Sequence, residues 1–229
     1  MTVRFLGQSG YVLKTENTEM IIDPYLSDSV NRVANRPRTL PLPMKPEDIS
    51  CDAVICTHNH LDHLDPDTVV KANENQFYIT TNEGKEELER LGRTNVRALG
   101  TGESITVGDF TITAVSAFHT VEAFGLIIET EHKTLYFSGD TFFDERLFEI
   151  SKYKPDCTFI CINGRLGNMN VNEALVTAQK IGEPVNVPNH YDMFESNSED
   201  PEKFTKHIYG GFTMEFNTEY ILTAGGLVK

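Results

Sequence analysis

Thr57-His58-Asn59-His60-Leu61-Asp62-His63 contains three imidazoles and a carboxylate, and it directly follows the apolar run Ala53-Val54-Ile55-Cys56. Side chains two residues apart on an extended chain point the same way, so His58 and His60 can bind one ion from the same side. Asp62 and His63 then turn toward a second ion position. Imidazole and carboxylate ligands together suit zinc, manganese or iron. The stretch therefore predicts a metal site where a strand ends.

The residues that follow the histidine turn indicate a helix. Asp65 can accept hydrogen bonds from the free backbone N–H groups of a helix start, and Pro66 is preorganised for the first helical position. The turn is therefore expected to join a strand to a helix.

Three further candidate ligands, His119, Asp140 and His190, each lie just past a run of strand-forming residues. A lone histidine is more often structural than a ligand, and Asp140 could also bond nearby backbone N–H groups in a tight turn. The repeated position after a strand favours metal binding for all three. The other two histidines, His132 and His207, are expected on the surface, in a hairpin turn and in a helix.

Most of the chain alternates between strand-like and helix-like runs. Strands are expected at residues 3–6, 11–15, 20–22, 53–56, 77–80, 96–99, 105–107, 110–113, 126–129, 135–138, 158–162 and 185–187. Helices are expected at residues 83–91, 144–151, 172–181 and 201–209. Residues 27–48, which are rich in proline, are expected to form an irregular excursion over the surface.

Length, composition and charge limit the class of protein. With 229 residues, 39% of them hydrophobic, the chain can bury one sizeable core, so we expect one domain over residues 1–229. No apolar run approaches the roughly 20 residues of a membrane helix, and the N-terminus lacks the form of a signal peptide, so we expect a cytoplasmic protein without a membrane partner. The four cysteines are expected to be reduced thiols in the core. A formal net charge of −14 argues against nucleic acid as a partner, because affinity for phosphate backbones depends on clustered Lys and Arg.

Taken together, these motifs resemble the metallo-β-lactamase superfamily, and the resemblance runs almost from end to end. Five segments also look like its L-ascorbate-6-phosphate lactonase branch: Phe5-Leu6-Gly7-Gln8-Ser9-Gly10-Tyr11, Asp23-Pro24-Tyr25-Leu26-Ser27-Asp28-Ser29, His58 to Asp67, Ile162-Asn163-Gly164-Arg165-Leu166-Gly167-Asn168-Met169 and His190-Tyr191-Asp192. The chain is markedly shorter than the ascorbate enzyme of that branch. Family membership alone therefore does not fix the substrate.

The resemblance implies a fold and a set of ligands. The fold is an α/β, four-layer αββα sandwich with the metal site at its edge. The implied ligands are His58, His60 and His119 for one ion, Asp62, His63 and His190 for a second ion, and Asp140 as the bridge between them. Members of the branch are often assigned manganese rather than zinc, and some sites hold one ion, so the expected cofactor is one or two ions of Mn²⁺ or Zn²⁺. Asp23 either supports the histidines through hydrogen bonds or forms an Asp-Pro turn.

A divalent ion lowers the pKa of bound water from about 15.7 toward 7 and acts as a Lewis acid toward a carbonyl or phosphoryl oxygen. We assign catalytic roles to Asp62, Asp140 and His190. Asp62 is expected first as a ligand and second as a proton-transfer group.

Substrate contacts are predicted from the cations and polar groups near the motifs. Arg165, Asn163 and Tyr191 are the expected contacts, since the planar guanidinium of arginine suits phosphate or carboxylate. Arg32, Arg36 and Arg38 in the irregular segment are either further anion contacts, or solvated loop charges or partners of neighbouring acids.

The leading hypothesis is a metal-dependent hydrolase of a small anionic substrate, with the lactone of a phosphorylated sugar acid, such as L-ascorbate 6-phosphate, as the specific expectation. Metal-dependent phosphodiester hydrolysis of cyclic nucleotides or RNA ends is the alternative, and iron-dependent oxidoreduction is a third. A non-catalytic metal-binding protein remains open, because function depends on the geometry of the substrate site as well as on the fold. A homo-oligomer is expected only from the resemblance.

Overall fold

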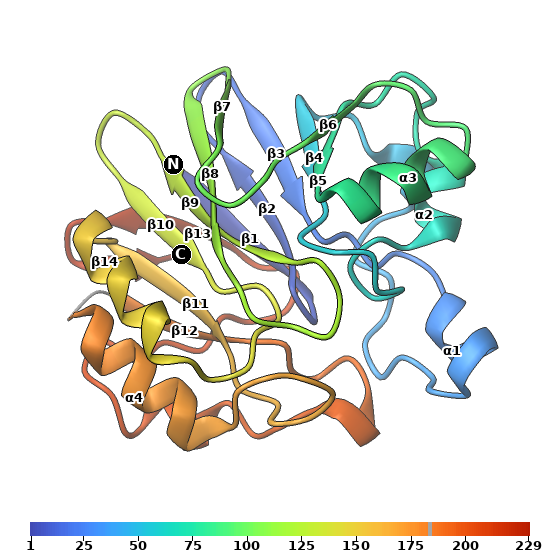
Figure 1. Cartoon of the computed structure of the whole chain (residues 1–229). Coiled ribbons are helices and arrows are strands. Elements are labelled where there is room, and N and C mark those ends of the chain that lie inside the picture. The colour runs from blue at the N-terminus through green and yellow to red at the C-terminus, as the bar shows by residue number, and fades with distance from the viewer. Residues whose placement is uncertain (183–184) are drawn as a thin grey trace.

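The computed structural model describes residues 1–182 and 185–229. Within these residues, two mixed β-sheets face each other and helices cover their outer faces (Figure 1). This arrangement confirms the αββα sandwich expected from the sequence.

The first sheet consists of β1 (Thr2–Gly7), β2 (Gly10–Lys14), β3 (Glu19–Ile22), β4 (Ala53–Ile55), β5 (Tyr78–Thr80), β6 (Val96–Ala98), β13 (Glu219–Thr223) and β14 (Gly226–Val228). Their order across the sheet is β14-β13-β1-β2-β3-β4-β5-β6. The sheet is antiparallel from β14 to β3 and parallel from β3 to β6.

The second sheet consists of β7 (Ser104–Val107), β8 (Phe110–Ser116), β9 (Phe124–Glu129), β10 (Thr134–Phe137), β11 (Cys157–Cys161) and β12 (Val185–Asn189). Their order is β12-β11-β10-β9-β8-β7, antiparallel from β7 to β10 and parallel from β10 to β12. The hairpin of β7 and β8 turns at Gly108, whose φ of +52° is the backbone conformation that glycine adopts readily.

The helices are α1 (Ser29–Ala34), α2 (Pro66–Lys71), α3 (Asn82–Arg90), α4 (Val171–Ile181) and α5 (Glu202–Thr205), and the 3₁₀ helices are η1 (Pro46–Asp48), η2 (Glu145–Tyr153) and η3 (Glu195–Asn197). Figure 1 shows α2 and α3 beside the parallel part of the first sheet and α4 beside β11 and β12. The Asp65 side chain accepts a hydrogen bond from the backbone N–H of Asp67 and caps α2, as predicted from Asp65-Pro66.

Alternation of side chains explains why both faces of the first sheet are buried. In β3, Met20 and Ile22 belong to the core between the sheets, whereas Ile21 packs into the core beneath α2 and α3. Tyr11 of β2 crosses between the sheets, with its ring centroid 4.9 Å from that of Phe159 in β11. These contacts hold the two sheets face to face.

Residues 27–48 were expected to be irregular, and this prediction was wrong in part because the segment contains α1 and η1. The Ser27 hydroxyl accepts a 3.0 Å hydrogen bond from the backbone N–H of Ser29, and Val30 is buried against the neighbouring loop. A helix of six residues is too short to show a recognisable apolar repeat.

The predicted helix at residues 201–209 is also shorter than expected. The backbone N–H of His207 already bonds to Phe204, three residues back, and the carbonyl of Gly210 accepts a hydrogen bond from β12. His207 therefore lies beyond α5 rather than in a helix. The helix predicted at residues 144–151 is the 3₁₀ helix η2, and the β13–β14 hairpin was not predicted.

None of the four cysteines forms a disulfide, and three of them are buried, which agrees with reduced core thiols. Among the described residues, no helix is both long and apolar enough to span a membrane.

Candidate metal centre

The predicted ligands come from loops at one edge of the sandwich. His58, His60, Asp62 and His63 follow β4, and His119, Asp140 and His190 follow β8, β10 and β12. Because β8, β10, β11 and β12 run in the same direction in their sheet, their carboxyl ends lie at the same edge. The structure brings all seven side chains together into two adjoining clusters.

The first cluster consists of His58, His60 and His119, whose ligand atoms lie within 4.8 Å of one another. Nε2 of His58 lies 2.9 Å from Nδ1 of His60, and Nε2 of His119 lies 3.2 Å from the same Nδ1 atom. Tetrahedral zinc with Zn–N bonds of about 2.0–2.1 Å would separate its nitrogen ligands by about 3.3 Å. The spacing of the three nitrogens is therefore close to that of a metal coordination sphere.

The second cluster consists of Asp62, His63 and His190. Oδ2 of Asp62 lies 3.4 Å from Nε2 of His190 and 3.8 Å from Nε2 of His63. This cluster combines two imidazoles with a carboxylate, a ligand set that zinc, manganese and iron accept.

Asp140 lies between the clusters. Its Oδ2 atom is 3.2 Å from Nε2 of His190 and 3.9 Å from Nε2 of His119, while its Oδ1 atom is 3.4 Å from Nε2 of His63. A carboxylate in contact with both clusters can bridge two ions.

Hydrogen bonds from outside the clusters fix the orientation of the rings. Nδ1 of His63 donates to Oδ2 of Asp23 at 2.7 Å, and the backbone N–H and hydroxyl of Thr57 donate to the same carboxylate. Nδ1 of His119 donates to the carbonyl of Gly167 at 3.1 Å. Both rings therefore present Nε2 to the centre. The supporting role expected for Asp23 is confirmed.

Gln8 also belongs to the centre, a role that was not predicted from the sequence. The residue is buried, and its Nε2 atom donates to Oδ2 of Asp62 at 2.8 Å and lies 3.1 Å from Nε2 of His190. Gln8 follows β1, so its only signal in the sequence is the same position after a strand that the ligands share.

The histidines of the first cluster are favourable neutral ligands. Burial lowers the pKa of His58, His60 and His119, and the neighbouring charge of His63 lowers it further. These imidazoles are therefore uncharged at neutral pH, which is the form that binds a metal ion.

In the second cluster, the pKa values of the histidines are raised instead of lowered. Burial opposes ionisation throughout this cluster, but Asp140, Asp23 and Asp62 raise the pKa of His63 well above its usual value. Asp140 and Asp62 likewise raise the pKa of His190 to about 9. Charges on the two histidines lower the pKa of Asp62 and of Asp140 in spite of burial. Without metal, the carboxylates of Asp62 and Asp140 are therefore ionised beside protonated His63 and His190. A divalent cation that binds there can displace the histidine protons.

Unpaired atoms test whether the residues fit a metal ion. Nε2 of His63 and Oδ1 of Asp140 are buried and have no hydrogen-bond partner among the described residues. The two atoms lie 3.4 Å from each other, and leaving buried polar atoms without a hydrogen bond costs about 1–3 kcal/mol each. A divalent ion would satisfy them, so the residues fit the expected cofactor.

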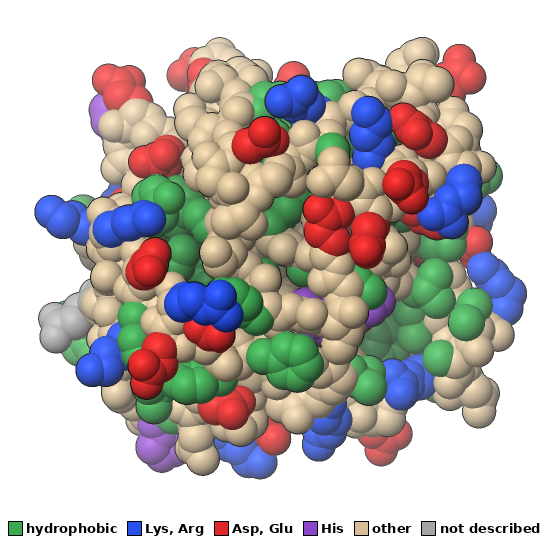
Figure 2. All heavy atoms as spheres, in the orientation of Figure 1, with side chains coloured by type: hydrophobic (Ala, Val, Ile, Leu, Met, Phe, Trp, Pro, Cys, Tyr) green, Lys and Arg blue, Asp and Glu red, His purple; other side chains and the backbone are tan. Residues whose placement is uncertain are grey.

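A cavity of about 520 Å³ opens onto the centre, and His60, Asp62 and Asp140 form part of its lining. This volume suits a small molecule. Figure 2 shows a recessed patch of histidine surface on this face of the molecule, with hydrophobic side chains beside it. The centre is therefore accessible from solvent.

The three predicted substrate contacts do not line this cavity. The Arg165 guanidinium donates to the carbonyls of Asn163 and Ser198 at 3.0 and 2.7 Å. Asn163 is buried, and its Nδ2 donates to Oδ1 of Asn197, which does line the cavity. The buried Tyr191 hydroxyl donates to a backbone carbonyl. Their role in substrate binding stays a prediction, and each side chain has a structural partner.

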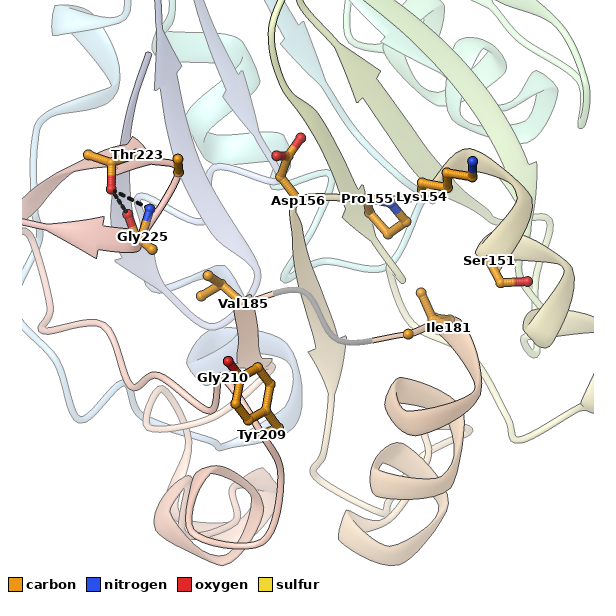
Figure 3. A pocket seen from close by; sticks show the side chains of 13 residues that line it. Ser151, Lys154, Pro155, Asp156, Ile181, Val185, Tyr209, Gly210, Thr223 and Gly225 are labelled. Carbon is orange, nitrogen blue, oxygen red and sulfur yellow. Dashed lines mark hydrogen bonds between the residues drawn. The ribbon is translucent and has the colours of Figure 1, made fainter.

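A second hollow, of about 750 Å³, lies near the start of β11 and β12, away from the carboxyl ends of the strands (Figure 3). It is lined by Lys154, Asp156 and Tyr209 among others. The Asp156 carboxylate already accepts hydrogen bonds from Lys133 and from the backbone of Thr134. None of the three groups with metal-ligand spacing among the described residues lies there.

Known proteins are similar to this chain in sequence and in fold. Residues 18–191 match the beta-lactamase superfamily domain. A protein named UPF0173 metal-dependent hydrolase from Oenococcus oeni is 24% identical over 239 residues, which cover 96% of this chain and 99% of that protein. The structure of isothiocyanate hydrolase from Delia radicum gut bacteria superposes with a TM-score of 0.82 at 21% identity, covering 98% of this chain and 100% of that one. CmlA, a diiron β-hydroxylase from Streptomyces venezuelae, superposes with a TM-score of 0.71 at 15% identity, covering 95% of this chain and 53% of that one.

Proposed function

This chain belongs to the metallo-β-lactamase superfamily and is a metal-dependent hydrolase, and from that premise we propose that its substrate is a small anionic lactone. The specific candidate is the lactone of a phosphorylated sugar acid, with L-ascorbate 6-phosphate as the first compound to test. The five segments similar to the L-ascorbate-6-phosphate lactonase branch support this choice.

One observation supports hydrolysis of a small molecule above the others. His60 of the first cluster, Asp62 of the second cluster and the bridging Asp140 all line the same cavity of about 520 Å³. A substrate in that cavity would touch both clusters at once. The buried atoms of His63 and Asp140 that lack a hydrogen bond support the proposal that ions are held beside them.

The proposed mechanism assigns each group of residues a task. His58, His60 and His119 would hold one divalent ion, Asp62, His63 and His190 a second, and Asp140 both. When bound, such ions lower the pKa of water and withdraw electron density from the carbonyl oxygen of the substrate.

Asp62 is the residue we assign to proton transfer. Its side chain is 17% exposed, against 6% for Asp140, so it is the more accessible carboxylate at the cavity. Its carboxylate can accept the proton of the attacking water and pass it to the leaving alkoxide. Gln8 fixes Oδ2 of Asp62 with its hydrogen bond, which leaves Oδ1 for that proton.

The test is hydrolysis of L-ascorbate 6-phosphate by manganese-loaded and zinc-loaded protein, followed by proton release. Asp140→Asn should lose turnover because it weakens the bridge between the clusters, whereas Asp48→Asn, which makes the same charge change at an exposed position on η1, should retain it. No turnover by protein with confirmed bound metal would contradict the proposed substrate. Bis(p-nitrophenyl) phosphate would then test the phosphodiesterase alternative.

A further inference from the structure

Arg36 is the only Lys or Arg among the described residues that line the cavity beside the metal centre. It follows α1 and is half-buried. Its guanidinium makes no hydrogen bond or ion pair with any residue of 1–182 or 185–229. Five donors of a permanently charged group are thus free at the edge of a small-molecule cavity.

The two neighbouring arginines contrast with Arg36. Arg32 donates two hydrogen bonds to the Asp67 carboxylate, at 2.7 and 2.9 Å. Arg38 donates to three backbone carbonyls and lies over the Tyr25 ring, 5.4 Å from its centroid. Both therefore have structural roles, and Arg36 does not.

The backbone on either side of Arg36 is held in place. Asn35 ends α1 in the left-handed conformation, with φ of 53°, and its N–H bonds to the carbonyl of Asn31 at 2.9 Å. On the other side, Arg38 ties the chain to the carbonyl of Ser27 at 3.1 Å. Arg36 is thus presented from a fixed segment, which reduces the entropy lost when it binds a ligand.

The remaining wall of the cavity is largely apolar. Val30, Leu61, Leu166 and Phe194 line it together with Arg36. Side chains of this kind give a substrate hydrophobic contact but no hydrogen bonds, so orientation must come from the few polar groups present.

We propose that Arg36 binds the carboxylate or phosphate of the substrate, while Val30, Leu61, Leu166 and Phe194 cover an apolar portion of the same molecule. The substrate class is then an oxyanion joined through a short carbon spacer, whose C–H groups contact these side chains, to the ester or lactone that reaches the metal centre. This inference rests on the proposed function, because the molecule that Arg36 binds is the one hydrolysed at the metal centre.

The experiment measures binding, so it does not depend on turnover. Manganese-loaded protein is titrated calorimetrically with glutarate, adipate and pimelate, and with the monomethyl ester of each. One carboxylate of every probe can bind the metal centre, and only the diacids carry a second anion for Arg36. At the chain length that spans the two sites, the diacid should bind about tenfold to a hundredfold more tightly than its monomethyl ester, as expected for charge-assisted hydrogen bonds.

Variants identify the residue responsible. Arg36→Gln should abolish the preference for the diacid, and Arg36→Lys should restore part of it. Arg97→Gln, which removes the same charge from an exposed position on β6, should leave it intact. Replacing the distal carboxylate of the best probe with a phosphonate distinguishes the two anions, because tighter binding that still requires Arg36 would assign phosphate and weaker binding carboxylate.

Equal affinity for diacid and monomethyl ester at every length, or a preference that survives in Arg36→Gln, would overturn the inference. The same preparations are assayed for hydrolysis of L-ascorbate 6-phosphate. A preference that depends on Arg36, without hydrolysis, would overturn only the proposed substrate. Hydrolysis without such a preference would overturn only the role of Arg36.

Discussion

Replacing Gly167 with alanine tests whether the loop after β11 positions a metal ligand. A Cβ atom at Gly167 would lie 2.9 Å from both Cε1 and Nδ1 of His119, where the ordinary contact distance is at least 3.4 Å. The His119 ring would therefore have to move by about 0.5 Å, since the backbone fixes the new methyl group. Gly167 also contacts His119 through its backbone, because its carbonyl oxygen accepts the hydrogen bond from Nδ1 of His119.

The size of the effect follows from the tolerance of metal coordination. Ligand distances at metal sites hold to within about 0.2 Å, so a ring displaced by about 0.5 Å loses its place in the coordination sphere. Loss of a supporting hydrogen bond to a ligating histidine typically costs about 10–100-fold in metal affinity. We expect Gly167→Ala to weaken zinc binding by about that factor, while the fold persists.

The assay is competition for zinc between the protein and a chromogenic chelator, with Gly102→Ala as the control. Gly102 has φ of +90°, close to the +98° of Gly167, and a Cβ atom there would meet nothing within 4 Å. Both variants therefore share the positive-φ penalty of about 1–2 kcal/mol, and only Gly167→Ala displaces His119. Equal zinc affinity in the two variants would refute the reasoning.

Three further predictions concern the second cluster. Asp23→Asn should lower metal affinity about 10–100-fold, because His63 loses its carboxylate partner; unchanged affinity in the chelator competition would contradict this. Gln8→Leu should lower kcat for the proposed substrate more than it changes KM, because the Asp62 carboxylate loses the hydrogen bond that orients it; an unchanged kcat would rule out a positioning role. In metal-free protein the pKa of His190 is raised to about 9. Binding of its proton therefore stabilises the fold fully below the usual histidine pKa of about 6.5, and this contribution to stability is lost as the pH rises through 9. The Tm of chelator-treated protein should therefore fall between pH 6.5 and 9.5, whereas that of metal-loaded protein should not, and parallel Tm profiles would be evidence against it.

The grouping of the seven candidate ligands was predictable because it depends largely on local features. Closely spaced histidines after an apolar run place several candidate ligands on one turn. Residues that directly follow strands of the same direction lie at the same edge of the sheet. For His119, Asp140 and His190, the prediction therefore required only the positions of three strands that run in the same direction. It did not require knowledge of which side chains meet. Asp23 follows β3 in the same way.

The cavity could not be predicted, because it depends on which side chains meet across the fold. Gln8, directly after β1, contacts Asp62 across 54 residues of sequence, and no spacing pattern predicts that contact. Arg165 was expected to contact the substrate, yet its guanidinium bonds to backbone carbonyls. Arg36, in a segment expected to be irregular, lines the cavity because the short helix α1 and its left-handed end direct the chain there.

The central claim is that the two clusters form a divalent metal centre on which hydrolysis depends. Counting the ions tests it most directly, by plasma mass spectrometry of desalted protein after loading with manganese or zinc. We predict two ions per chain in the natural protein, one held by each cluster, and loss of bound metal when His58 and His63 are both replaced by alanine. Metal-free protein after loading, or the same ion content in that double variant, would contradict the claim.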